Sequence, residues 1–336
     1  MREFFAAYKN ECYKINKKGK IFIVMAVLVG LMLIMTLGFG LINDLIGDYS
    51  SAIVDMSREE MQAVIDTNKA IIENYKPNKK LGLTDNTIYN AKVEIAFYQF
   101  LLDNNLNLSN INKAGSLSMN SAGYIDSAIT LAMGIITIFA IVMACKNLGG
   151  EKSNGTLKMQ AMRPVSRSEM LSAKWLSVWS ISSLMLVVVV VVAQIVAMIK
   201  FGVETKPVVC VLNAKVAVKM PYLTYLTIQM LANIISLLCI IQLSHFVCSL
   251  MWKKGNALAI VMLMYFLGSG IEKLLGYIYI GYVGFWGNLN FLSALSVDIT
   301  PNLKGMNLYS MLAITALWQV GMITYNYLHF DRCDIA

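Results

Sequence analysis

Residues 149–167, GGEKSNGTLKMQAMRPVSR, contain residue types that bind phosphate groups. Gly150 and Gly155 have the spacing of a phosphate-binding loop, and lysine and serine residues lie near them. Such a loop needs a lysine and then a serine or threonine directly after its second glycine, for the phosphates and for Mg²⁺. Here Thr156 and Leu157 follow Gly155, and the stretch follows an apolar segment instead of a buried strand. The sequence therefore argues against ATP binding by these residues.

The same stretch predicts a short helix in a connecting loop. Gly149-Gly150 is expected to end the preceding apolar helix, and residues 154–156 (Asn-Gly-Thr) are expected to begin a new one. Pro164 ends it, because the residue before a proline is disfavoured in the helical region. A capping box at residues 166–169, Ser-Arg-Ser-Glu, begins the next apolar helix. The predicted helix, Gly155 to Arg163, carries basic side chains and is suited to docking into a groove of a soluble partner.

From Glu151 to Lys174 the chain has the pattern E-x-x-x-G-T-L-K-x-x-x-x-R-P-V-S-R-x-x-x-L-x-x-K. This pattern resembles the permease subunits of ABC-2 type transporters, in which the region is the coupling helix that touches a separate ATPase subunit. The ending HFDRCDIA is similar to that family's basic-Asp ending, with Cys333 where a second basic residue is common. A loop that only fixes orientation would explain the basic residues, but not the glycine, proline and capping signals. The resemblance assigns the ATPase contact to Glu151, Gly155, Thr156, Leu157, Lys158, Arg163, Pro164, Val165, Ser166 and Arg167.

The composition predicts a membrane protein. Of the 336 residues, 57% are hydrophobic and only 14% are charged, against about 25% charged in an ordinary soluble domain. A helix needs about 20 apolar residues to cross a bilayer. Six stretches meet this need, which predicts an all-α polytopic protein with transmembrane helices at 21–42, 123–146, 169–200, 223–252, 255–275 and 308–330. The first is too long for a signal peptide and lacks a cleavage site.

The segments between the predicted spans have distinct patterns. An amphipathic helix is expected to lie in the membrane interface at 1–20, the alternative being a plain basic flank. Ser57 and Glu60 have capping-box spacing in a predicted helical hairpin. The remaining expectations are an extracytoplasmic hairpin at 43–122, a coupling-helix loop at 147–168, an extracytoplasmic strand or irregular loop within 201–222, a re-entrant or interfacial hairpin (or an aromatic belt) at 276–305 and a tail at 331–336.

The charge distribution predicts the orientation. Lysine and arginine clearly outnumber the acids on the side that holds both termini, and the other side is nearly balanced. Because basic loops stay inside, both termini are predicted to be cytoplasmic, in a bacterial plasma membrane. The net charge of +8 is therefore attributed to topology and not to nucleic-acid binding. The six cysteines form no obvious disulfide framework.

Polar residues inside the spans are candidates for a translocation path. Gln229, Asn233 and Ser236 share one helical face of the fourth predicted span. Hydrogen bonding between helices is the alternative explanation for these residues. No acid or lysine is expected in the middle of a span, which argues against an ion-coupled carrier, and the two histidines have no metal-ligand cluster around them.

The resemblance implies the membrane subunit of an ATP-driven exporter. Two permease copies, or one copy and a paralogue, would form the path within membrane lipid, and the ATPase subunits would hold ATP and magnesium. No cofactor and no enzymatic activity are then expected in this chain. The methionine content, 22 residues, favours an amphipathic or hydrophobic cargo such as an antimicrobial peptide, a peptide toxin or an antibiotic. The alternative is a non-transporting sensor or scaffold with an extracytoplasmic ligand-binding hairpin.

Overall fold

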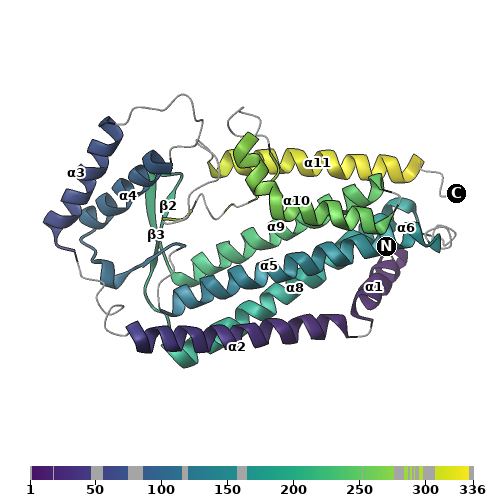
Figure 1. Cartoon of the computed structure of the whole chain (residues 1–336), viewed down its shortest axis with the longest axis horizontal. Coiled ribbons are helices and arrows are strands. Elements are labelled where there is room, and N and C mark those ends of the chain that lie inside the picture. The colour runs from purple at the N-terminus through teal and green to yellow at the C-terminus, as the bar shows by residue number, and fades with distance from the viewer. Residues whose placement is uncertain are drawn as a thin grey trace.

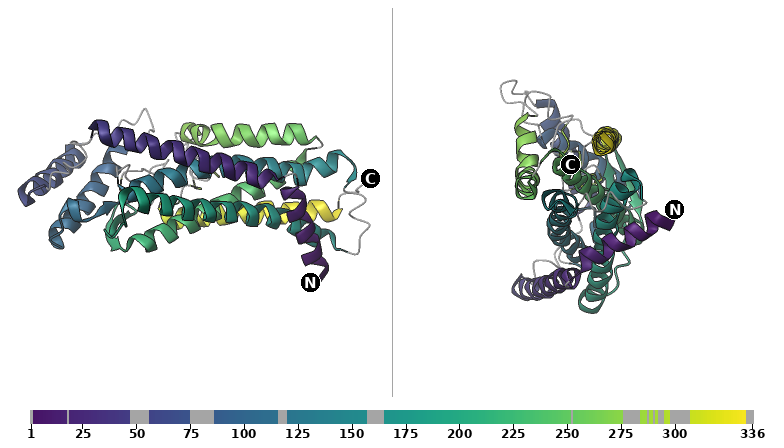
Figure 2. Two further views of the ribbon diagram at one scale, coloured as in Figure 1. Left: turned by 90° about the horizontal axis from the view of Figure 1, so that it is seen from below. Right: turned by 90° about the vertical axis from the view of Figure 1, so that its right-hand side faces the viewer.

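The structure is a computed structural model that describes residues 2–17, 19–46, 56–74, 86–115, 120–156, 165–251, 253–275, 284–286, 288–289, 291, 295–297 and 307–332. Long helices lie side by side along one direction, with a hairpin and a small sheet at one end (Figure 1). Helix α1 lies at the other end and runs across the direction of the bundle (Figure 2). The helices of the bundle end are α1 (Arg2–Asn16), α2 (Lys20–Ile46), α5 (Ser121–Asn147), α6 (Gly149–Ser153), α8 (Arg167–Phe201), α9 (Tyr222–Leu250), α10 (Lys254–Leu275) and α11 (Leu308–Arg332).

Five of the described helices are long and apolar enough to cross a membrane. Their apolar stretches are Lys20–Gly38, Ser121–Ser153, Arg167–Phe201, Tyr222–Leu250 and Leu308–Phe330. The apolar part of α10, Lys254–Gly268, is shorter. A helix thus covers each of the six predicted spans, and five of them meet the length and composition required. A sixth crossing stays a prediction.

Helix α5 is the centre of the bundle and contacts α2, α8, α9 and α10. Four alanines at helical spacing, Ala128, Ala132, Ala140 and Ala144, are completely buried on it. Small side chains allow helix backbones to approach closely, which is how helices gain packing energy inside a bilayer. In contrast, α2 lies at the periphery and exposes large apolar side chains such as Leu37. A continuous apolar surface of this kind requires lipid or another protein to cover it.

The predicted hairpin is formed by α3 (Arg58–Asn74) and α4 (Asn86–Asp103), which pack against each other. The capping box is confirmed, because the Ser57 amide donates to Glu60 Oε2 at 2.7 Å and the Glu60 amide donates to Ser57 Oγ at 3.2 Å. Phe97 and Leu101 of α4 are completely buried in a cluster with residues of the sheet. The hairpin therefore has its own apolar core, separate from that of the bundle.

The segments around this hairpin form a three-stranded sheet. Strand β2 (Val208–Leu212) pairs in parallel with β1 (Asn112–Lys113) and antiparallel with β3 (Val216–Met220). In the three-residue loop between β2 and β3, Asn213 and Ala214 have φ values of 53° and 55°, the left-handed backbone of both central residues of a type I′ turn. The valine alternation within 201–222 thus corresponds to strands. A 3-10 turn, Leu108–Asn110, and β1 lie between α4 and α5, within the segment for which only a helical hairpin was predicted.

Some expected features lie wholly or mainly outside the described residues. These are most of the hairpin predicted at 276–305, of which only a few residues are described, and the tail beyond Arg332. A described part of the 276–305 segment does pack on the bundle: Phe285 and Leu289 join the cluster formed by the ends of α9, α10 and α11.

Candidate functional site

The glycine pair before the motif does not end a helix. Helix α5 ends at Asn147, and α6 begins at Gly149 after a single residue. A Cβ added to Gly149 would lie 3.3 Å from Cys248 Sγ, and one added to Gly150 would lie 3.4 Å from Lys254 Cδ. The expectation that this pair terminates the helix was wrong, because the missing side chains serve close packing against the ends of α9 and α10.

Gly155 is the residue that terminates α6. Its φ is +69°, and its amide donates to the Lys152 carbonyl at 3.3 Å. A left-handed glycine just after the last turn is a common way for a helix to end. Gly155 therefore ends α6, and the next residue, Thr156, is again helical, where the predicted helix was expected to begin. The rest of that predicted helix, with its contact residues Leu157, Lys158, Arg163 and Pro164, lies outside the described residues.

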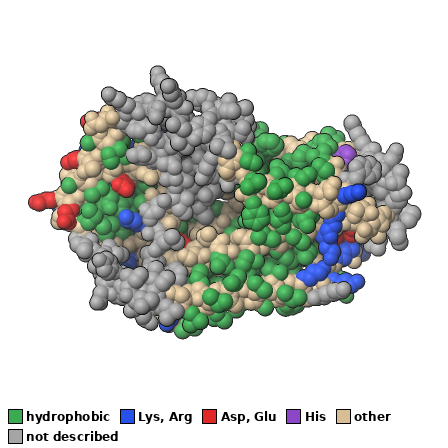
Figure 3. All heavy atoms as spheres, viewed as in Figure 1, with side chains coloured by type: hydrophobic (Ala, Val, Ile, Leu, Met, Phe, Trp, Pro, Cys, Tyr) green, Lys and Arg blue, Asp and Glu red, His purple; other side chains and the backbone are tan. Residues whose placement is uncertain are grey.

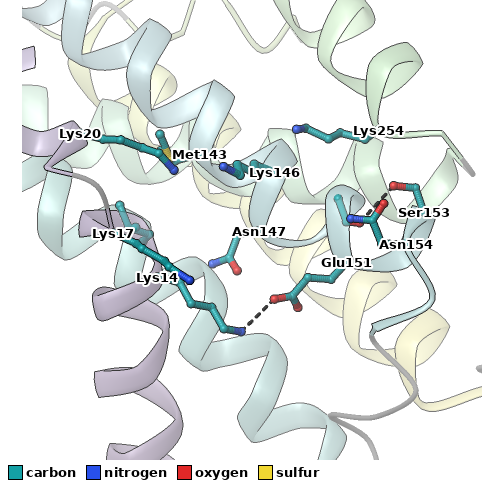
Figure 4. A pocket seen from close by; sticks show the side chains of 12 residues that line it. Lys14, Lys17, Lys20, Met143, Lys146, Asn147, Glu151, Ser153, Asn154 and Lys254 are labelled. Atoms are coloured by element: carbon teal, nitrogen blue, oxygen red, sulfur yellow. Dashed lines mark hydrogen bonds and ion pairs between the residues drawn. The ribbon is translucent and has the colours of Figure 1, made fainter. Parts of the chain in front are cut away.

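Glu151 is the centre of an ion network that joins three elements (Figure 4). Its Oε1 atom lies 2.8 Å from Lys14 Nζ of α1, and its Oε2 atom pairs with Lys174 Nζ of α8. Glu11 of α1 completes the network, with its Oε1 atom 2.7 Å from Lys14 Nζ and 3.4 Å from Lys174 Nζ. Two carboxylates and two ammonium groups balance each other, so the network has no net charge.

Three members of the network are withdrawn from solvent, and Lys14 at its edge is 34% exposed. The Lys174 side chain has 0% exposure and that of Glu11 has 6%. Buried ions lose most of their hydration energy, and removing one partner leaves the others uncompensated. Burial alone would lower the pKa of Lys14, but hydrogen bonds to Glu11 and Glu151 outweigh it and raise that pKa.

Further contacts hold α1 and α5 against α8 near Lys174. The Asn147 side chain donates to the Lys174 carbonyl at 3.3 Å, at the end of α5. Tyr8 Oη of α1 lies 2.6 Å from Ser180 Oγ of α8, two turns further along. Helix α1 is thus attached to α8 by both an ion network and a hydroxyl pair.

The rest of the predicted contact region is attached to the neighbouring helices. The capping box of α8 is confirmed, because the Ser166 and Glu169 side chains each accept from the other residue's amide. Arg167 Nη1 donates to the Phe330 carbonyl of α11 at 3.5 Å. Val165 packs against the apolar cluster at this end of the bundle. Thr156 Oγ1 donates to the Glu151 carbonyl at 3.4 Å.

Helix α6 is also attached to α9 and through it to α11. Lys152 Nζ donates to the Ser249 carbonyl at 2.9 Å, and Ser249 Oγ donates to Asn326 Oδ1 at 2.9 Å. A displacement of the five-residue α6 would therefore act directly on α1, α8 and α9.

The three residues predicted to line a path have different surroundings. Gln229 and Ser236 are buried and Asn233 is half-buried. Ser236 Oγ donates to the Leu289 carbonyl at 3.0 Å, so this hydroxyl makes a contact between segments. That is the role named by the alternative explanation, and the path itself stays a prediction.

Sequence reasoning did not identify Glu11 and Lys14 as site residues. One signal was present: Glu11 lies on the face of α1 that carries Tyr8, Cys12 and Ile15, where a solvent-facing acid is not expected. Lys14 has no comparable signal, because a lysine beside a predicted interface is ordinary. Their partner in α6 is more than a hundred residues away in the sequence.

Fold and composition define the class: this is a mostly helical membrane protein with a small sheet and a helical hairpin at one end of the bundle. Residues 91–336 match the family described as protein of unknown function (DUF2705), and the chain belongs to that family. The match includes Glu151 and Lys174 and begins after Glu11 and Lys14. No protein of curated function matches the sequence.

Proposed function

We propose that the chain is the membrane subunit of an ATP-driven ABC exporter, which couples ATP hydrolysis in a separate ATPase subunit to export of a cargo. One observation carries the proposal. The first and last residues of the motif from Glu151 to Lys174 are ion-paired, although the expected ATPase contact region separates them in sequence. Force applied to that region would therefore be delivered at both of its ends to the same buried network.

Helix α8 is suited to transmit such a force. It has 35 residues, which corresponds to about 50 Å at the helical rise of 1.5 Å per residue. Lys174 lies near its beginning, and its other end at Phe201 leads to strand β2. Rigid-body movement of packed helices is a common route for switching between states. A displacement at α6 would then reach the sheet through a single helix.

The charge distribution supports the proposed orientation. Lysine and arginine side chains gather at the end with α1 and α6, and acidic side chains gather over α3 and α4 (Figure 3). Basic residues are retained on the cytoplasmic side of a membrane. In the proposal, both termini are cytoplasmic, six helices cross a bacterial plasma membrane, and the hairpin and sheet lie outside.

A second permease copy or a paralogue completes the proposed transporter. The exposed apolar surface of α2 and α8 supplies area for lipid and for such a partner. The cargo class proposed is an amphipathic or hydrophobic compound, a peptide or an antibiotic. Flexible methionine side chains adapt to varied apolar ligands, and the chain has 22 of them.

The test is ATP-dependent efflux from vesicles that contain the chain together with its ATPase. Arg163→Glu reverses a charge in the region expected to contact the ATPase, and we expect about a tenfold loss of cargo-stimulated ATP hydrolysis and efflux. Lys219→Glu makes the same change on strand β3, at the other end of the molecule, and should leave both rates unchanged. Equal rates for the two variants would contradict the coupling role.

The rival function is a sensor or scaffold without transport. The separate apolar core of the α3–α4 hairpin favours it, since that core makes the hairpin a distinct unit. The same vesicles distinguish the two, because a sensor would give no efflux of any amphipathic peptide while its ATPase partner remained bound.

A further inference from the structure

A lysine-rich pocket of about 520 Å³ lies beside the ion network. It is formed where α1, α2, α5, α6 and α10 meet (Figure 4). This volume is within the usual range for small-molecule sites, about 300–1,000 Å³. Five lysines line it: Lys14, Lys17, Lys20, Lys146 and Lys254.

Among the described residues that line this pocket, lysines outnumber acidic residues. Glu151 is the only acid among the described residues that line it, and that carboxylate already contacts Lys14 and Lys174. In Figure 4 the side chains of Lys20 and Lys254 extend toward Lys146 from opposite sides. Several ammonium groups around one concave surface repel each other and create a positive potential. A bound anion would relieve this repulsion.

The position of the pocket indicates what kind of anion would reach it. Lys20 begins α2, and Phe22 and Ile23 in the first turn of that helix are 71% and 62% exposed. The pocket therefore lies at the border between the basic end and the apolar surface of the helices. Ile15 and Met143 add apolar lining inside it. A ligand with a negative head and an apolar tail fits both surfaces.

We propose that this pocket binds the phosphate group of an anionic lipid headgroup. Lysines near the membrane surface attract anionic lipids, and basic pockets between helices bind their headgroups. Side chains of Asn147 and Asn154 in the same lining carry amide groups that can donate hydrogen bonds to phosphate oxygens. The apolar surface beside the mouth favours a lipid over an acidic protein segment or a free phosphate ion.

Occupancy of this pocket bears on the ion network, because Lys14 and Glu151 belong to both. A headgroup held between α1 and α6 would fix their relative positions. The inference requires only that the helices lie in a membrane. It is independent of any ATPase, so a failed coupling experiment would leave it intact.

The test measures lipid binding to the purified full-length chain in detergent micelles by native mass spectrometry. The probes are phosphatidylglycerol, zwitterionic phosphatidylcholine, and soluble inorganic phosphate and glycerol phosphate. The double variant Lys146→Gln/Lys254→Gln removes two pocket charges outside the ion network. Removal of each lysine is expected to lower the affinity about fivefold, so the double variant should bind phosphatidylglycerol roughly 25-fold more weakly. Lys146→Arg/Lys254→Arg, which keeps the charge, should bind normally.

Lys215→Gln/Lys219→Gln, with two exposed lysines removed at the far end, is the matched control and should bind like the unmodified chain. The proposal is overturned if phosphatidylcholine binds as tightly as phosphatidylglycerol, or if the control loses as much affinity as the pocket variant. It is also overturned if soluble phosphate competes at equal concentration, or if an acidic peptide displaces the lipid while phosphatidylglycerol alone gives no saturable binding.

Discussion

At the scale of single residues, Lys174 is the charged group whose removal is expected to destabilise the fold most. Its ammonium is completely buried and its two partners come from different elements, Glu11 of α1 and Glu151 of α6. A solvated lysine at the start of a long helix would be an ordinary surface residue. This one lies between two carboxylates, and both of them also pair with Lys14.

Lys174→Met keeps the apolar stem of the side chain and removes its charge. We expect a loss of about 3–5 kcal/mol in the free energy of unfolding, since breaking a buried pair leaves uncompensated charge. Lys200→Met changes an exposed lysine of the same helix and should shift stability by less than about 0.5 kcal/mol. Urea unfolding of both variants in detergent micelles measures the difference, and equal midpoints would mean that the network does not stabilise the fold.

Two of the four residues of this ion network could be identified from the sequence. Glu151 and Lys174 both belong to the motif that marked the stretch for attention, whereas Glu11 and Lys14 do not. The reason is physical: a motif records residues that are near one another along the chain. The contacts with Glu11 and Lys14 arise only when α1 packs across the start of α8.

At the scale of elements, local sequence signals predicted the structure correctly where a residue pattern has a single structural role. Both capping boxes form as expected, because a side-chain oxygen three residues before a glutamate has few other local partners. Glycine has two uses, close packing and a left-handed backbone, and the sequence does not separate them. Gly149 was therefore interpreted wrongly, since it packs against Cys248, whereas Gly155 terminates α6 directly before Thr156, where a helix begins again.

A pair of alanine substitutions tests this assignment. Gly155→Ala places a side chain at a φ of +69° and should cost about 1–2 kcal/mol. Gly134→Ala lies inside α5 with nothing within 4 Å of the added Cβ, so it should be neutral or stabilise by up to about 1 kcal/mol. Thermal melting of the two variants should move in opposite directions. A melting temperature for Gly155→Ala at or above that of the unmodified chain would refute the terminating role.

At the scale of the whole molecule, composition was sufficient to predict a membrane protein and insufficient to predict the sheet at one end of the bundle. Long apolar runs can hardly be anything but helices in a membrane, so their positions followed directly. The sheet was not foreseen as a unit, because β1 and β2 are far apart in the chain and β1 has only two residues. No periodicity is detectable over so short a strand.

The proposed topology makes a prediction at this scale. In a background without native cysteines, Lys215→Cys lies in the turn between β2 and β3, and Lys17→Cys lies between α1 and α2. A membrane-impermeant maleimide should label the first variant in intact bacterial cells and the second only after the cells are opened. Labelling of both without opening the cells would show that the two ends of the bundle are not on opposite sides.

The order of the sheet, β1-β2-β3, has a consequence for shortened forms of the protein. Strand β1 is the only described cover on one edge of β2, and it lies in the chain directly after the hairpin. A truncation that removes the hairpin together with β1 would bare a row of unsatisfied amides and carbonyls on an all-apolar strand. Uncovered edges of this kind recruit other strands and aggregate. The hairpin segment therefore acts as a shield that keeps neighbouring molecules from adding to this sheet.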